Sequence, residues 1–284
     1  MSQPPSAGPE FSAPKFAGCY RHPDRETGIS CQRCSRPICG ECMNAASVGF
    51  HCPKCVASGR STSRAPRTRF GAPMGSGGSG TATKAVMGVL VGLYVLNLLS
   101  GGRLLGLLAL SNSAVYAGEL WRLLTFGFTS VGLLGLLMNL LVLWLAGIAM
   151  EAALGSWRFV ALYVAAGLGG ATLFFVAGPI GMATVGASAS VVGLLSANAI
   201  VKHKGGEDIR PDIGLLVLLV LYSVLVGFNS YGWLGLVGGI VVGAVVGAVM
   251  AYAPRHRRTA SQVFGLLAVV LACLLAVTAR LFTG

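Results

Sequence analysis

The chain has 284 residues, of which 54% are hydrophobic and only 11% are charged. Soluble domains carry about 25% charged residues, so the composition excludes an ordinary soluble enzyme and indicates that most of the chain lies in a lipid bilayer. The formal net charge of +12 is expected of cytoplasmic loops beside anionic lipid, and it does not require a nucleic-acid partner.

Four pairs of potential metal ligands follow one another between residues 19 and 55, and two residues separate the partners in each pair. The pairs are Cys19 and His22, Cys31 and Cys34, Cys39 and Cys42, and Cys52 and Cys55. Eight ligands suffice for two tetrahedral zinc sites with no position left open for catalysis. A segment this short has almost no hydrophobic core, so metal would supply its folding free energy. We therefore predict a module with two structural zinc ions, in which His51 is either a surface residue or a ligand in place of Cys52.

The segments that flank this module lack any regular hydrophobic pattern. We predict a disordered tail over 1–18 and a flexible linker, rich in Gly, Ser and Arg, over 56–84. Linker arginines can contact acidic headgroups or remain solvated. No long apolar run precedes Lys84, so we expect the amino-terminal region to stay in the cytoplasm, where cysteines remain reduced. A cytosolic protein is the expected partner of the module, because it shows no evident nucleic-acid recognition helix.

From Lys84 onward, apolar runs dominate and predict seven membrane helices, each near the length of about 20 residues that spans a bilayer. The predicted ranges are 85–100, 126–147, 158–177, 185–202, 212–228, 231–252 and 261–281. Lysines and arginines gather between the fourth and fifth helices and between the sixth and seventh. The positive-inside rule therefore predicts a multi-pass protein of the plasma membrane, with its amino terminus in the cytoplasm and its carboxyl terminus outside. Cys273, alone in the last run, is expected to be a buried hydrophobe.

Residues 101–125 are too long for a tight turn and too amphipathic for a free loop. We expect a lateral segment embedded in the membrane interface, with Trp121 and Arg122 as headgroup anchors.

Five motifs then follow in chain order: "ELWRLLTFGF" (119–128), "GLLMN" (135–139), "EAALGSWRF" (151–159), "VGASASVVG" (185–193) and "GLVGGIVVGAVVG" (235–247). They resemble the motifs of the rhomboid family of intramembrane serine proteases. The resemblance implies an all-α rhomboid fold, with a six-helix core over 85–252 and a seventh helix over 253–284. The amino-terminal module resembles zinc fingers of the B-box type, and this implies that its first ligand pair combines with the third and its second with the fourth.

The rhomboid resemblance also implies roles for individual residues. Ser188 takes the position of the nucleophile, and Asn139 that of a hydrogen-bond donor to the oxyanion of the reaction. Glycines four residues apart allow a close approach of membrane helices, and the helices that carry Ser188 and the catalytic base meet in this way in the family. Structural roles are implied for Trp121, Arg122, Glu151, Gly155, Gly186, Gly235 and Gly239.

Two positions depart from the family pattern, and both concern the reaction centre. Gly135 stands where the second-helix motif usually has histidine, and Gly232 stands where the sixth-helix motif has the catalytic histidine. Neither glycine can accept a proton from Ser188. His203 lies 15 positions beyond Ser188, about 22 Å along a helix, and Lys202, Lys204 and His256 are similarly remote.

These departures favour a rhomboid homologue that binds membrane-spanning clients but is catalytically impaired, a pseudoprotease. An active intramembrane endopeptidase remains the alternative, and it would need Ser188 and a base that the motifs do not reveal. A transporter or channel is disfavoured, because the predicted helices lack the intramembrane charges that line ion paths. The membrane domain is expected to need no cofactor.

Overall fold

The computed structural model describes residues 16–62, 68, 70, 80–227, 231–254 and 258–283. The chain forms two compact units, Met1–Ala65 and Pro66–Gly284, which are considered separately. Most of the predicted tail and much of the predicted linker lie outside the described residues.

The first unit consists of two short hairpins and one helix. Strand β1 (Ala17–Gly18) pairs antiparallel with β2 (Glu26–Thr27), and β3 (Asn44–Ala45) pairs antiparallel with β4 (Phe50–His51). A 3₁₀ turn, η1 (Gly40–Cys42), precedes the second hairpin, and α1 (Pro53–Thr62) follows it. The buried cluster of this unit consists of Ile38 and five cysteines. One aliphatic side chain is too little to fold such a unit, so its stability must come from elsewhere.

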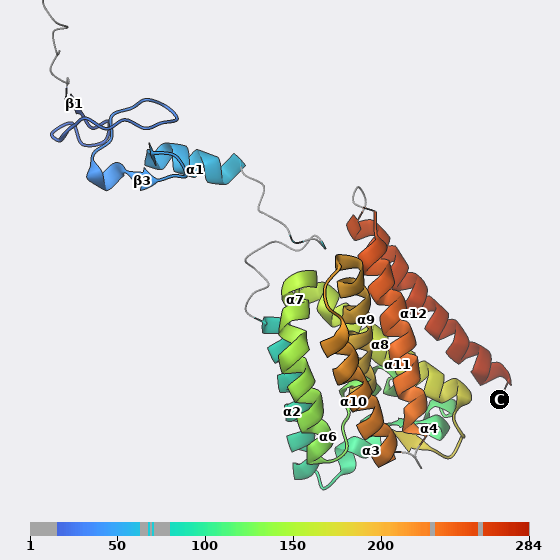
Figure 1. Cartoon of the computed structure of the whole chain (residues 1–284). Coiled ribbons are helices and arrows are strands. Elements are labelled where there is room, and N and C mark those ends of the chain that lie inside the picture. The colour runs from blue at the N-terminus through green and yellow to red at the C-terminus, as the bar shows by residue number, and fades with distance from the viewer. Residues whose placement is uncertain are drawn as a thin grey trace, which may run out of the picture. The chain divides into compact units, whose positions relative to one another are not determined.

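The second unit contains seven long helices in its described part. They are α2 (Thr81–Leu99), the continuous α6 (Leu133–Val142), η3 (Leu143–Gly147) and α7 (Ile148–Leu154), then α8 (Ser156–Ala177), α9 (Ala187–Gly205), α10 (Arg210–Gly227), α11 (Gly232–Tyr252) and α12 (Arg258–Thr283). Figure 1 shows these helices side by side and alternating in direction, with α7 at one end of the bundle and the short helices α3 and α4 at the other.

Five helices in the described residues are long and apolar enough to cross a membrane: α2, α6 through α7, α8, α11 and α12. The last turn of α9 carries Lys202, His203 and Lys204, and the first turn of α10 contains Asp212. Length and composition therefore confirm a multi-pass helical protein but not all seven predicted spans.

The predicted start of the second membrane helix is wrong. Residues 122–128 form two short helices, α5 (Arg122–Thr125) and η2 (Phe126–Phe128), and the long helix begins only at Leu133. Extended backbone at Thr129 ends the short turns. Gly132 precedes the long helix with a φ of 73°, which glycine adopts without the steric cost of a Cβ. The helix then runs on to Leu154, beyond the predicted end at 147.

The segment between α2 and α6 contains α3 (Arg103–Leu108), β5 (Leu110–Ser111) and α4 (Asn112–Tyr116), and β5 pairs antiparallel with β6 (Ala183–Thr184). Arg122 is not a headgroup anchor, because only 6% of it is exposed. Its guanidinium donates to the carbonyl oxygens of Gly106 and Ala109, at 2.8 and 2.7 Å, and pairs with Glu119. Irregular backbone at membrane depth needs such internal partners. Trp121, by contrast, is 52% exposed.

The start of α2 is capped by a residue far along the chain. The carboxylate of Glu151 accepts hydrogen bonds from the backbone N–H groups of Ala82 and Thr83, at 3.0 and 2.8 Å, and from the hydroxyl of Ser156 at 2.7 Å. The first N–H groups of a helix have no partners within it. Glu151 therefore joins the beginning of α2 to the junction of α7 and α8, where Gly155 has a φ of 88°.

Helices α8, α9 and α11 touch along their backbones. A Cβ added at Gly243 would overlap the carbonyl oxygen of Gly193, and one added at Gly239 would overlap that of Ala189. A Cβ at Gly247 would lie 2.7 Å from the Cα of Ala197. The four-residue spacing of these glycines thus produces the close contact expected of small residues in membrane helices.

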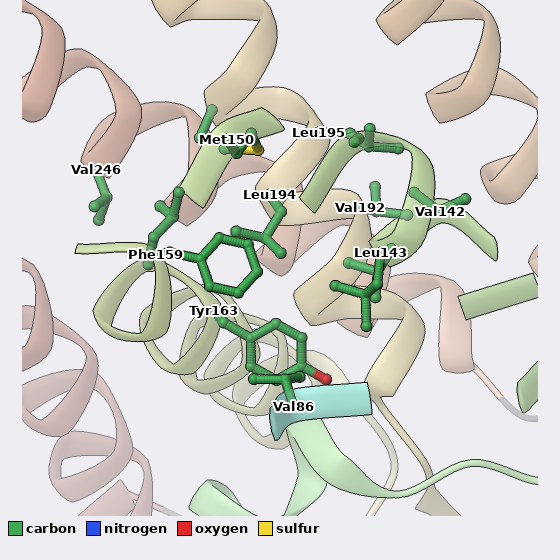
Figure 2. Close-up of a cluster of buried hydrophobic side chains, with 14 of the residues drawn as sticks. Val86, Val142, Leu143, Met150, Phe159, Tyr163, Val192, Leu194, Leu195 and Val246 are labelled. Atoms are coloured by element: carbon green, nitrogen blue, oxygen red, sulfur yellow. The ribbon is translucent and has the colours of Figure 1, made fainter. Parts of the chain in front are cut away.

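A layer of larger side chains packs around this contact. Figure 2 shows Phe159 and Tyr163 of α8 among Val192, Leu194 and Leu195 of α9, with aliphatic residues of α2 and η3 beside them. The hydroxyl of Tyr163 donates to the carbonyl oxygen of Gly127 at 2.7 Å. This bond attaches η2, and with it the loop before α6, to the centre of the bundle.

Because its Cβ would overlap a backbone carbonyl, Gly243→Ala should destabilise the bundle. Overpacking of this kind costs about 1–3 kcal/mol, and we expect a lower thermal unfolding midpoint in detergent micelles. Gly88→Ala on α2 is the matched control, since a Cβ there meets nothing within 4 Å. Equal midpoints for the two variants would contradict a backbone contact at Gly243.

Candidate functional site

The eight predicted metal ligands form two separate clusters in the first unit. One contains Cys19, His22, Cys39 and Cys42, and the other contains Cys31, Cys34, Cys52 and Cys55. Within each cluster the ligand atoms all lie within 4.8 Å of one another. The first pair therefore combines with the third and the second with the fourth, as the B-box resemblance implies. Neither cluster includes His51, which lies on β4.

Sulfurs of the second cluster accept hydrogen bonds from backbone N–H groups. The amides of Cys52 and Cys55 donate to the sulfurs of Cys31 and Cys52, at 3.2 and 3.3 Å. Burial raises the pKa of the Cys31 thiol, but backbone hydrogen bonds outweigh burial and lower this pKa to about 6. The thiolate is the form that binds metal. Four convergent ligands from cysteine and histidine suit a tetrahedral ion, so both clusters fit a metal of this kind.

The four predicted positions of the reaction centre, Ser188, Asn139, Gly135 and Gly232, line a single cavity of about 450 Å³ in the second unit. Its walls come from α6, from the first turns of α9 and α11, from α10 and from β6. The volume lies within the range of about 300–1,000 Å³ that is usual for ligand sites. Tertiary structure thus brings together residues up to 97 positions apart, from 135 to 232.

Ser188 lies half-buried in the first turn of α9. Two backbone hydrogen bonds define this turn: the amides of Gly186 and Ala187 donate to the carbonyl oxygens of Phe126 and Thr129, at 3.1 and 3.0 Å. A Cβ at Gly186 would overlap the ring of Phe126, so only glycine fits there. The amino-terminal end of a helix carries a partial positive charge that stabilises nearby anions, and Ser188 is therefore well placed for a reaction that develops negative charge.

Asn139 faces the cavity from α6 with 4% of its surface exposed. Its side-chain nitrogen donates to the hydroxyl of Ser130 at 3.4 Å, while its oxygen is buried without a hydrogen-bond partner. A buried polar atom left unpaired costs free energy. The amide thus retains hydrogen-bonding capacity for a group that enters the cavity.

Among the described residues, no histidine, lysine or carboxylate lines the cavity. Exposed His203 lies at the far end of α9. Lys202 pairs there with Asp212 at 2.7 Å, and Lys204 donates to the carbonyl oxygen of Ala251 at 2.7 Å. Tyr231 is 40% exposed just before α11 and does not line the cavity. The remaining histidine of the second unit, His256, lies outside the described residues.

Tyr222 and Ser223 of α10 also line the cavity, although neither belongs to a sequence motif. They are adjacent polar residues inside the apolar run "LLVLLVLYSVLV". A polar residue in a membrane helix indicates a functional site or an interhelical hydrogen bond. Asn139 meets this criterion, and so do Tyr222 and Ser223.

The geometry defines a class of protein: a multi-pass membrane bundle with a serine and an asparagine in a cavity at the start of one helix. The family model described as "Rhomboid domain" matches residues 117–253. Over 63 residues the chain is 44% identical to the rhomboid protease GluP of Bacillus subtilis (strain 168). The aligned segment covers 22% of this chain and 12% of that relative. The chain thus spans only a small part of the relative it matches. Residues 117–253 of the membrane unit are thus identified as a rhomboid domain, as the motifs predicted.

The clusters of the first unit predict two divalent metal ions per chain. Cys31→Ser should reduce the metal content below two and expose the first unit to proteolysis, because bound metal would supply its folding free energy. Elemental analysis of the purified protein and limited proteolysis measure both effects. Cys273→Ser is the control, since Cys273 lies in α12. Two ions retained in Cys31→Ser would contradict the assignment.

Proposed function

We propose that this protein binds transmembrane segments of other membrane proteins without cleaving them. One observation carries the proposal: the cavity keeps Ser188 and Asn139 but has glycine at 135 and 232, and no histidine, lysine or carboxylate lines it in the part of the chain that the structure describes. Serine is a weak nucleophile until an adjacent base activates it. Loss of the base in serine proteases lowers the turnover rate roughly a millionfold.

The same cavity supports binding. It combines aliphatic walls with unpaired hydrogen-bonding groups, and a membrane segment that enters it can satisfy those groups. Polar groups inside a bilayer otherwise lack partners. Retention of Asn139 and of the turn at Gly186 is thus consistent with a site that still holds a polypeptide.

For the first unit we propose two structural zinc ions. Cysteine and histidine in tetrahedral sets are the usual ligands of structural zinc, and four protein ligands leave no open position for chemistry. The unit would then serve as a docking module for a cytosolic protein. Val48, at the turn between β3 and β4, is 78% exposed and offers an apolar contact for such a partner.

We further propose that the amino terminus is cytoplasmic and the carboxyl terminus outside, in the plasma membrane. Lys202, Lys204 and Arg210 lie together at the junction of α9 and α10. Alternation of the helices places this junction at the same end of the bundle as the start of α2 (Figure 1). Basic residues concentrate on the cytoplasmic side of membrane proteins.

An active endopeptidase is the second candidate. It is favoured by the 44% identity to a relative whose name is that of a protease, together with the presence of Ser188 in the cavity. This candidate needs a base other than the lining residues of the cavity.

A fluorophosphonate probe that reacts with activated serines distinguishes the two. We expect the purified protein to remain unlabelled, like its Ser188→Ala variant, while an active rhomboid protease labels strongly alongside. Labelling of the unmodified protein that disappears in Ser188→Ala would show an activated serine and refute the proposal.

Conversely, Gly232→His should gain labelling, because it restores an imidazole at the start of α11 beside the cavity. Only the neutral imidazole accepts a proton, and the ordinary histidine pKa is about 6.5. The labelling rate should therefore rise with pH through about 6.5 and level off above it. Gly92→His on α2, where a Cβ meets nothing within 4 Å, is the control and should stay unlabelled.

A further inference from the structure

Tyr222 presents a hydrogen-bonding group to the cavity from a helix that none of the sequence motifs covers. It lies on α10 and lines the cavity together with Ser188 and Asn139. Among the residues that the structure describes, the phenol of Tyr222 makes no hydrogen bond. A half-buried hydroxyl without a partner has a donor and two lone pairs available for a bound group.

The position of this hydroxyl relative to α6 is specific. A Cβ added at Gly135 would lie 3.8 Å from the phenolic oxygen of Tyr222. Asn139 follows Gly135 by four residues and lies on the same face of the helix. The Tyr222 hydroxyl therefore lies beside the position that a side chain at 135 would occupy, on the face of α6 that carries Asn139.

Two contacts hold α10 in this position. Asp212 in its first turn is 3% exposed, accepts a hydrogen bond from the side chain of Asn198 at 2.7 Å and pairs with Lys202. Leu219, one turn before Tyr222, is 2% exposed. These are the two fully buried side chains among those described on α10, while Val217, Leu218 and Leu221 are more than half exposed.

We infer that Tyr222 contacts the bound client and supplies a second hydrogen bond, beside that of Asn139, to a client carbonyl oxygen next to Ser188. The inference rests on the proposed function, because it requires a polypeptide in the cavity. A carbonyl oxygen has two lone pairs and accepts two donors. The phenol hydroxyl carries one hydrogen that it can donate to such an oxygen. Gly135 has no side chain that could donate a hydrogen bond, and Tyr222 on α10 donates one instead.

The Gly232→His variant makes this hydrogen bond measurable. In the labelling reaction the Ser188 oxygen forms a bond to phosphorus, fluoride leaves, and the imidazole at 232 takes the serine proton. The phosphoryl oxygen gains negative charge in this step, and loss of one donor to such an oxygen lowers the rate by about 10²-fold. Adding Tyr222→Phe to Gly232→His should therefore slow labelling by about that factor.

Gly135→His provides the rescue. In a triple variant with Gly232→His and Tyr222→Phe, a histidine at 135 should restore most of the lost rate, because it supplies a donor on the same face of α6. Tyr252→Phe in the Gly232→His background is the matched control, since Tyr252 lies at the other end of α11 and is 62% exposed. It should leave the rate unchanged.

Each outcome decides the inference. Unchanged labelling in the Tyr222→Phe variant, or a loss that Gly135→His does not rescue, would overturn it. Labelling of Gly232→His only when Gly135→His is also present would overturn it as well, because Tyr222 would then supply no donor. If neither histidine variant labels while both unfold at the wild-type midpoint, the cavity stabilises no oxyanion and the inference fails. Failure of the proposed function is a different result, namely Ser188-dependent labelling of the unmodified protein.

Discussion

The cavity depends on the backbone contact between α9 and α11. Glycines four residues apart on α11 meet the carbonyl groups of Ala189 and Gly193 on α9, and no other residue type would allow the two axes to approach so closely. This contact brings the first turns of both helices, with Ser188 and Gly232, to one site. The large side chains of α8 and η3 and the loop held by Tyr163 pack around it.

With the helices in place, the chemistry of the cavity depends on the absence of side chains at Gly135 and Gly232. An imidazole at 232 would make Ser188 a nucleophile. Without it, the polar side chains that line the cavity in the described residues are hydroxyls and one amide, which can hydrogen-bond a neutral polar group but are not general bases. Gly135 offers no donor of its own, and the Tyr222 hydroxyl lies beside the position that a side chain at 135 would occupy. The proposed loss of catalysis is therefore compatible with retention of hydrogen-bonding groups in the cavity.

The two units reach stability by different means. In the second unit, apolar helices bury one another and polar groups such as Arg122 and Glu151 are paired internally. The first unit buries one aliphatic side chain, Ile38, among cysteines, so metal would take the role of a core. The ligand pairs of the two clusters interleave along the chain, and each proposed ion would connect residues about 20 positions apart.

The sequence by itself determined the helical membrane class, the ligand pairs, the rhomboid motifs and the absence of histidine at 135 and 232, because these depend on composition and on short spacings. It could not determine the start of α6, since Gly132 interrupts an apolar run that reads as one helix. Nor could it show that Arg122 is buried, because its partners at Gly106 and Ala109 are set by the fold of the loop. Only the tertiary structure placed Tyr222 opposite Gly135: the two residues are 87 positions apart, from 135 to 222, and their approach results from the packing of α10 through Asp212 and Leu219.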